Sequence, residues 1–291
     1  MRIASLLSSA TEIVYELGLQ AHLVAISHEC DWPPEALALP RLSRVRFDPA
    51  GLTSAEIDAE VRRCMLEHGS VYEVDARALA EARPDLVLTQ AVCEVCAVPT
   101  ASVHEAVVGL DHPPQVLSLD AHTLEEIVAS VVDVAEAAGE PRAGAETAAR
   151  LRARIARVRD AVAGRPRPRV LALEWLDPPF APGHWIPEMV TRAGGEPALG
   201  VAGTRSSRIT WDEAVDSRPD LVVCAPCGFD LDGSTSLAED VRHRFPDVPV
   251  WAVDADGHFA RPGPRLVDGV EVLAQVLHPD GAPGPTAARR V

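Results

Sequence analysis

The sequence lacks any long hydrophobic run. A membrane-spanning helix needs about 18 or more consecutive apolar residues, and no stretch of this 291-residue chain reaches that length. The apolar run that follows Met1 and Arg2 ends after about five residues, which is shorter than the core of a secretory signal peptide. We therefore predict a cytoplasmic protein without membrane insertion, whose six cysteines are reduced thiols or metal ligands rather than disulfides.

Positive charge is also scarce. The chain has 27 basic and 43 acidic residues, which give a net charge of −16. Nucleic acids and anionic membrane surfaces attract basic proteins, so this balance argues against both as partners. A small-molecule ligand remains the expected partner.

Common catalytic motifs are missing as well. The sequence has no G-x-S-x-G, no phosphate-binding glycine loop and no metalloprotease helix. Gly194-Gly195 is more simply explained as the end of a helix. We predict that the chain is not an enzyme, and an enzyme that modifies a cofactor through thiol chemistry is the least favoured alternative.

A sequence repeat stands out among the features that are present. Each copy begins with Arg-Pro-Asp, continues as a short apolar run and leads into a C-x-x-C pair. Such runs are typical of buried parallel strands, whose carboxyl ends form the ligand-binding edge of an open α/β sheet. The two copies are Arg83-Pro84-Asp85-Leu86-Val87 before Cys93 and Cys96, and Arg218-Pro219-Asp220-Leu221-Val222 before Cys224 and Cys227.

Strand and helix patterns alternate on both sides of a long helical region. This order predicts an α/β fold of two Rossmann-like lobes joined by one long helix, with a ligand cleft between the lobes. The tail is rich in Pro, Gly and Ala, which predicts disorder. The predicted parts are an N-terminal lobe over 1–120, a linking helical region over 121–165, a C-terminal lobe over 166–278 and a disordered tail over 279–291.

Several segments together resemble the cobalamin-binding, ABC-transporter-type substrate-binding proteins. This family belongs to the helical-backbone metal receptor superfamily, whose other members bind haem, iron-siderophores or metal ions. The likeness covers about residues 2–278. It rests on Ser8-Ser9-Ala10-Thr11-Glu12, Asp31-Trp32-Pro33-Pro34, Pro178-Pro179-Phe180-Ala181-Pro182-Gly183 and Phe259-Ala260-Arg261-Pro262-Gly263.

The resemblance implies a corrinoid ligand such as cobalamin, held in the cleft by loop residues. It also implies an ABC transporter permease as partner, although the lack of a leader argues against delivery from outside the cell. Aromatic residues make up only 4% of the chain, and several fall in the loops concerned. The ligand-binding residues implied are Asp31, Trp32, Gln90, Phe180, His184, Trp185 and Phe259.

The four C-x-x-C cysteines support a second reading. Cys93, Cys96, Cys224 and Cys227 have the spacing of zinc or iron–sulfur half-sites. The alternatives are unmetallated thiols that line a pocket, or a thiolate that serves as axial ligand to the metal of a corrinoid. Three loop histidines are further candidates for metal or axial ligands, although ordinary packing roles are favoured for them: His28, His184 and His258.

Overall fold

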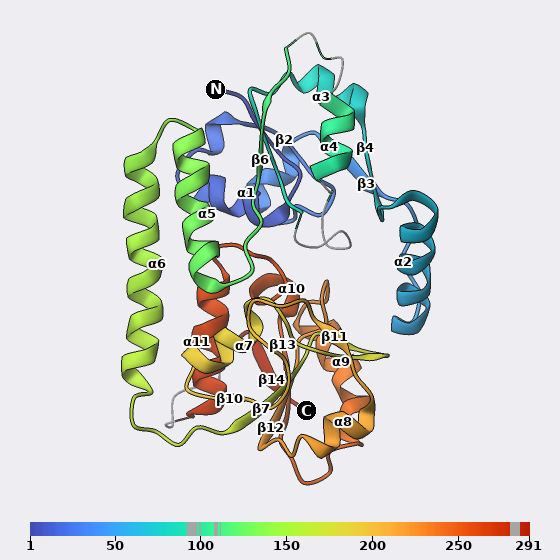
Figure 1. Cartoon of the computed structure of the whole chain (residues 1–291), viewed down its shortest axis with the longest axis vertical. Helices are drawn as coiled ribbons and strands as arrows, with labels where there is room; N and C mark the ends of the chain where they lie inside the picture. Colours follow the sequence, from blue (N-terminus) through green and yellow to red (C-terminus); the bar gives the residue numbers. More distant parts are fainter. Residues whose placement is uncertain (92–97, 99, 108–109, 111, 280–285) are drawn as a thin grey trace. The chain divides into compact units, whose positions relative to one another are not determined.

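The computed structural model describes residues 1–91, 98, 100–107, 110, 112–279 and 286–291 (Figure 1). The chain divides into two compact units. Unit 1 contains Met1–Ala121 and Val128–Ala149, and unit 2 contains His122–Ile127 and Arg150–Val291. Among the described residues, no helix is both long enough and apolar enough to cross a bilayer.

Unit 1 is built on a parallel sheet with the strand order β2-β1-β5-β6. In chain order, β2 pairs with one side of β1, and β5 and then β6 are added on the other side. The strand order therefore switches between β1 and β5. Apolar residues on one face pack against α3 and α4, which gives this side of the sheet its core. The bounds are β1 (Ile3–Ser5), β2 (Leu23–Ile26), β5 (Leu86–Thr89), β6 (Gln115–Ser118), α3 (Ala76–Ala82) and α4 (Thr100–Val107).

The remaining elements of unit 1 surround this sheet. An antiparallel pair, β3 and β4, flanks helix α2, and α1 follows β1 directly. Helix α2 begins at a capping box in which Thr53 and Glu56 satisfy each other's backbone amides. The bounds are α1 (Ser8–Glu16), α2 (Ser54–His68), β3 (Ser43–Val45), β4 (Tyr72–Val74) and the short 3-10 helices η1 (Gln20–His22) and η2 (Pro34–Ala38).

Unit 2 repeats the plan. Its main sheet has the order β10-β7-β12-β13-β14, and the strand order switches between β7 and β12. Figure 1 shows α7 and α11 on one face of this sheet and α8 and α9 on the other. The strands are β7 (Arg169–Leu173), β10 (Glu196–Pro197), β12 (Leu221–Cys224), β13 (Val250–Val253) and β14 (Ala288–Arg290).

A small antiparallel sheet, in the order β11-β9-β8, follows the end of β7. The strands are β8 (Trp175–Leu176), β9 (Pro179–Ala181) and β11 (Ser207–Arg208). The helices of unit 2 are α7 (Ile186–Arg192), α8 (Trp211–Asp216), α9 (Leu231–Arg242), α10 (Ala255–His258) and α11 (Leu266–Leu277). The prediction of an α/β fold with two Rossmann-like lobes is confirmed.

Helices α5 (Leu124–Ala137) and α6 (Pro141–Ala161) each contain residues of both units. The predicted long linking helix corresponds to α6. Its Arg154 side chain donates to Glu271 on α11 over 3.0 Å and also pairs with Asp268. This network fixes the second half of α6 to unit 2.

The Arg-Pro-Asp repeat has a structural role in both sheets. Asp85 accepts a hydrogen bond from the amide of Arg2, and Asp220 accepts one from the amide of Arg169, each over 2.7 Å. Each aspartate therefore joins the start of the repeat strand to the start of the neighbouring central strand, β1 or β7. Arg83 and Arg218 both adopt positive φ angles, 43° and 47°, where the preceding helix ends.

The predicted disordered tail is wrong for its last residues. Ala288–Arg290 forms β14, which pairs antiparallel with β13, so that Trp251 lies opposite Arg290. The pairing covers a strand edge that would otherwise expose unpaired backbone groups. The Pro and Gly content of the tail predicted disorder. This prediction fails for Ala288–Arg290 because composition does not report long-range strand pairing. Residues 280–285 lie outside the described residues.

Candidate functional site

The carboxyl edge of the unit 1 sheet carries the first group of candidate residues. The loop after β2 contains Asp31 and Trp32, and Gln90 directly follows β5. Asp31 is exposed, and the Trp32 side chain is 46% exposed, whereas Gln90 is buried. The sequence placed these residues correctly at the edge where ligands bind in α/β sheets. Of these three residues, Trp32 is the one that offers a large apolar surface.

The thiol of Cys30 helps to hold the Trp32 loop. Cys30 is fully buried, and its Sγ lies 3.0 Å from Oγ1 of Thr11 in α1. Thr11 in turn donates to Ser5 at the end of β1, over 2.9 Å. The hydroxyl of Ser8 donates to the carbonyl of Glu29 in the same loop, over 2.7 Å. The S-S-A-T-E segment thus positions the loop through hydrogen bonds.

His28 is fixed within unit 1 in a packing arrangement. Its Nδ1 lies 2.8 Å from the hydroxyl of Ser43, and its Nε2 lies 2.9 Å from a carboxylate oxygen of Glu29. Its ring also contacts the Tyr72 ring, with centroids 5.1 Å apart. Both ring nitrogens therefore have neighbours in the protein, which favours the packing role.

The carboxyl edge of the unit 2 sheet carries an aromatic pair that the sequence interpretation did not single out. Trp175 follows β7 and Phe229 follows β12, so the two flank the point where the strand order switches. Their ring centroids are 5.9 Å apart, and both residues are partly exposed. The available signal was their position just after two predicted strands. Phe180, one of the predicted ligand residues, pairs with Trp175 across β8 and β9 and is half-buried.

Two of the predicted ligand-contact residues are buried. Trp185 is 7% exposed and Phe259 is 2% exposed, and the indole N–H of Trp185 donates to the carbonyl of Phe259 over 2.7 Å. Both rings are therefore part of the packing beneath the edge and present little surface to a ligand. Their loop positions suggested exposure, but the folding of segments from distant parts of unit 2 covers them.

His184, also predicted to bind ligand, packs against a second histidine, His122. The rings of His122 and His184 stack with centroids 5.7 Å apart. Burial lowers the pKa of His184, and the charges of His122 and Arg205 lower it further. The neutral form of His184 is therefore favoured. Nothing in the local sequence around His122 indicates this contact.

The cysteine pairs do not form a metal site among the described residues. No group of three or more His, Cys, Asp or Glu side chains there has metal-binding geometry. Cys224 lies inside β12, where its thiol packs in an apolar cluster with Ala238 and Val241 of α9. Burial raises the pKa of the Cys224 thiol, which disfavours the thiolate that binds metals. This burial argues against Cys224 as a metal ligand, and Cys93 and Cys96 lie outside the described residues.

The two cysteines of the second pair should therefore differ in reactivity. We expect an alkylating reagent to modify Cys227, which is half-buried, well before Cys224 in the native protein, because the thiolate is the reactive form. Peptide mass spectrometry over a time course measures this difference. The urea-unfolded chain, in which both thiols react at similar rates, is the control. Equal rates in the native protein would contradict the burial of Cys224.

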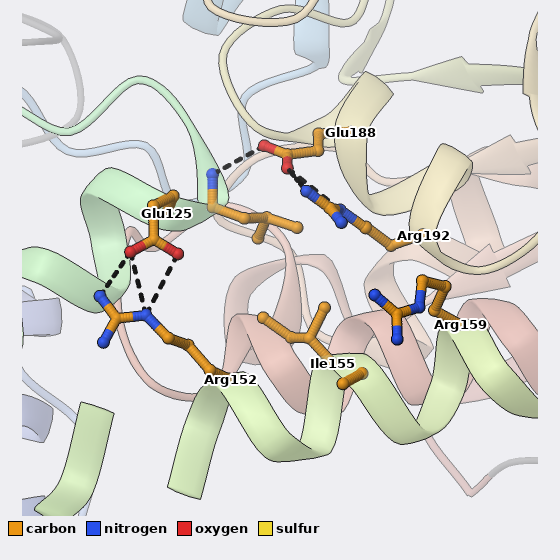
Figure 2. A pocket seen from close by; sticks show the side chains of 8 residues that line it. Glu125, Arg152, Ile155, Arg159, Glu188 and Arg192 are labelled. Carbon is orange, nitrogen blue, oxygen red and sulfur yellow. Dashed lines mark hydrogen bonds and ion pairs between the residues drawn. The ribbon is translucent and has the colours of Figure 1, made fainter. Parts of the chain in front are cut away.

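A hollow of about 150 Å³ lies elsewhere on unit 2, between α6 and the first turns of α5 and α7 (Figure 2). Arg152 pairs with Glu125, and Arg192 donates to Glu188 over 2.8 Å. The second Glu188 oxygen accepts the amide of Leu124 over 3.0 Å. Ligand pockets usually reach 300 Å³ or more. The hollow is small, and its charged side chains pair with one another. We therefore interpret it as a gap between packed helices rather than as the ligand site.

The family of the chain follows from its sequence and agrees with this fold. Residues 3–246 match the model of the family described as periplasmic binding protein, and the chain belongs to that family. Its members are substrate-binding proteins of ABC transporters, which bind small ligands and do not convert them. The prediction that this chain is not an enzyme is confirmed by this membership.

The vitamin B12-binding protein of Vibrio cholerae is one relative. It is 22% identical over 280 residues, which are 95% of this chain and 88% of that protein. The vitamin B12-binding protein of Vibrio vulnificus is 20% identical over 278 residues, 94% of this chain and 89% of that protein. The predicted resemblance to cobalamin-binding receptors is confirmed.

Solved structures share the fold. The periplasmic vitamin B12-binding protein BtuF of Vibrio cholerae has a TM-score of 0.69 at 21% identity, over 97% of this chain and 98% of that one. A periplasmic heme-binding protein from Pseudomonas aeruginosa has a TM-score of 0.71 at 17% identity, over 100% of this chain and 94% of that one. At these identities the likeness establishes the fold and leaves the ligand open.

Proposed function

We propose that this chain binds a metal-centred tetrapyrrole, a corrinoid such as cobalamin in the first place, without converting it. The observation that carries the proposal is the position of exposed or partly exposed aromatic rings at the carboxyl edges of the sheets. Trp32 lies at this edge of unit 1, and Trp175 with Phe229 lies at this edge of unit 2. Large flat ligands bind well against such rings, and the vitamin B12-binding relatives favour the corrinoid.

Haem is the second candidate. It shares the flat ring and the central metal, and heme-binding proteins are among the solved structures with this fold. The role of an ABC transporter permease as partner belongs to the same proposal. The cytoplasmic location remains a prediction from the sequence.

A titration tests the proposed ligand. The protein is purified anaerobically, analysed for metals, and titrated with cyanocobalamin and separately with haemin while visible spectra are recorded. We expect saturable binding of cyanocobalamin at one equivalent by metal-free protein. Tighter binding of haemin would favour the second candidate. Stoichiometric zinc or iron in the purified protein, with no response to either ligand, would overturn the proposal in favour of the metal-binding alternative.

A further inference from the structure

One cross-strand row of the small antiparallel sheet combines two aromatic rings with a positive charge. Arg208 of β11 lies directly opposite Phe180 of β9, and Phe180 lies directly opposite Trp175 of β8. Residues that are paired in this way project from the same face of a sheet, with Cβ atoms about 4.5–5.5 Å apart. The three side chains therefore share one face, and Arg208 lies at one end of the row.

The cross-strand row adjoins the carboxyl edge of the main sheet of unit 2. At the end of the row away from Arg208, the Trp175 ring contacts the ring of Phe229, which follows β12, with centroids 5.9 Å apart. The three aromatic residues are partly exposed, and Arg208 is exposed. The row is about 10 Å long, because neighbouring strands are about 4.8 Å apart. A flat ligand that lies on the aromatic rings can therefore bring its periphery close to Arg208.

The strand that carries Arg208 is fixed on both sides of this residue. The amide of Ile209 donates to the carbonyl of Pro179 over 2.9 Å. The hydroxyl of Ser206 donates to the carboxyl group of Glu174, which directly follows β7. These contacts hold the backbone of Arg208 beside the aromatic rings. A charge that is already in place binds a ligand at a lower entropic cost than a charge on a mobile segment.

The charge of Arg208 has no carboxylate partner within the described part of the chain. The side chain makes no ion pair or hydrogen bond there, whereas the exposed Arg192 of the same unit pairs with Glu188 over 2.8 Å. The chain as a whole carries a net charge of −16 and repels anions. An anionic ligand therefore needs a local positive group, and the planar guanidinium group binds carboxylates and phosphates through paired N–H donors.

We propose that Arg208 binds an oxyanion carried by the flat ligand, whose ring packs against Phe180 and Trp175. This inference rests on the proposed function, because it names a charged group that the same ligand must carry. Haem supplies the oxyanion through its propionate carboxylates, and cobalamin supplies it through the phosphodiester of its nucleotide. Arg208 is then a specificity-determining residue, which favours such ligands over flat molecules that lack the negative group.

Two pairs of ligands test this role, and the second member of each pair lacks the oxyanion. Haemin is compared with its dimethyl ester, and cyanocobalamin with dicyanocobinamide, which has no nucleotide phosphate. Spectral titrations give the dissociation constants. We expect Arg208→Gln to weaken binding of the oxyanion-bearing ligand by about tenfold or more, and to leave the affinity for its counterpart unchanged. Arg157→Gln, which removes the same charge from an exposed position on α6, is the matched control and should follow the wild type.

Two results of these titrations would overturn the proposal. The first is an equal loss of affinity for both members of a pair, because Arg208 would then act through packing rather than on the oxyanion. The second is an unchanged affinity of Arg208→Gln for the oxyanion-bearing ligand. The Tm of Arg208→Gln without ligand should equal that of the wild type, since the side chain is exposed.

A third pair of probes separates this proposal from the proposed function. Anilinonaphthalene sulfonate carries a sulfonate on a small flat ring system, and phenylnaphthylamine has the same rings without it. If neither haemin nor cyanocobalamin binds, the proposed function fails, and fluorescence titrations with these two probes decide the role of Arg208. Weaker binding of the sulfonate alone, in Arg208→Gln alone, would support that role. Equal sulfonate binding by the wild type and Arg208→Gln, or no binding by either, would overturn it.

Discussion

Phe259→Ala is expected to lower the free energy of unfolding by about 3–5 kcal/mol, the usual cost of truncating a buried aromatic ring. The Phe259 side chain is 2% exposed, so the deletion leaves a cavity beneath the carboxyl edge of unit 2. The carbonyl of the same residue accepts the Trp185 indole N–H over 2.7 Å, and a shift of this backbone would disturb that bond too. Urea denaturation followed by circular dichroism measures the loss.

Phe259→Leu is the control for this prediction. It keeps most of the apolar volume and should cost less than about 1.5 kcal/mol if the site tolerates the change of shape. The sequence assigned Phe259 to ligand contact, and the two roles give opposite results. A Phe259→Ala protein with unchanged stability and lost cyanocobalamin binding would restore ligand contact as the role of this ring.

Trp32→Ala should weaken cyanocobalamin binding by at least about tenfold, which corresponds to about 1.4 kcal/mol. The ring is 46% exposed at the carboxyl edge of unit 1, so ligand binding can bury the rest of its surface. Burial of an aromatic ring against a flat ligand contributes on this scale. Isothermal titration calorimetry at pH 6.5 gives the dissociation constants of both proteins.

The stability of Trp32→Ala separates binding from folding. Because much of the ring is already in solvent, we expect its free energy of unfolding to change far less than that of Phe259→Ala. Leu66→Ala is the matched control, since Leu66 is 88% exposed on α2 and should affect neither affinity nor stability. Unchanged affinity in Trp32→Ala would remove Trp32 from the proposed ligand surface.

The sequence predicted the central strands well for a physical reason. In each repeat, Arg and Pro end a helix, and the apolar run that follows is long enough for only one buried strand. The observed strands, Leu86–Thr89 and Leu221–Cys224, match the predicted ones. The sequence did not reveal that Asp85 and Asp220 join neighbouring strands. Each carboxylate accepts a hydrogen bond from a backbone amide that is far away in the chain.

The candidate site was predicted only in part. The sequence placed the Trp32 loop and Gln90 at the correct sheet edge. No local pattern indicated that the carboxyl group of Glu174 accepts hydrogen bonds from Gly183 and Ser206.

The sequence by itself determined the α/β alternation, the strands of the repeat and the loops that follow them. These features depend on local patterns of apolar, capping and turn residues, which are legible over a few positions. Only the tertiary structure decided that Trp32 is exposed while Phe259 and Cys224 are buried, and that His122 meets His184. The exposure of a loop side chain depends on which distant segments pack over it, and no local pattern contains that information.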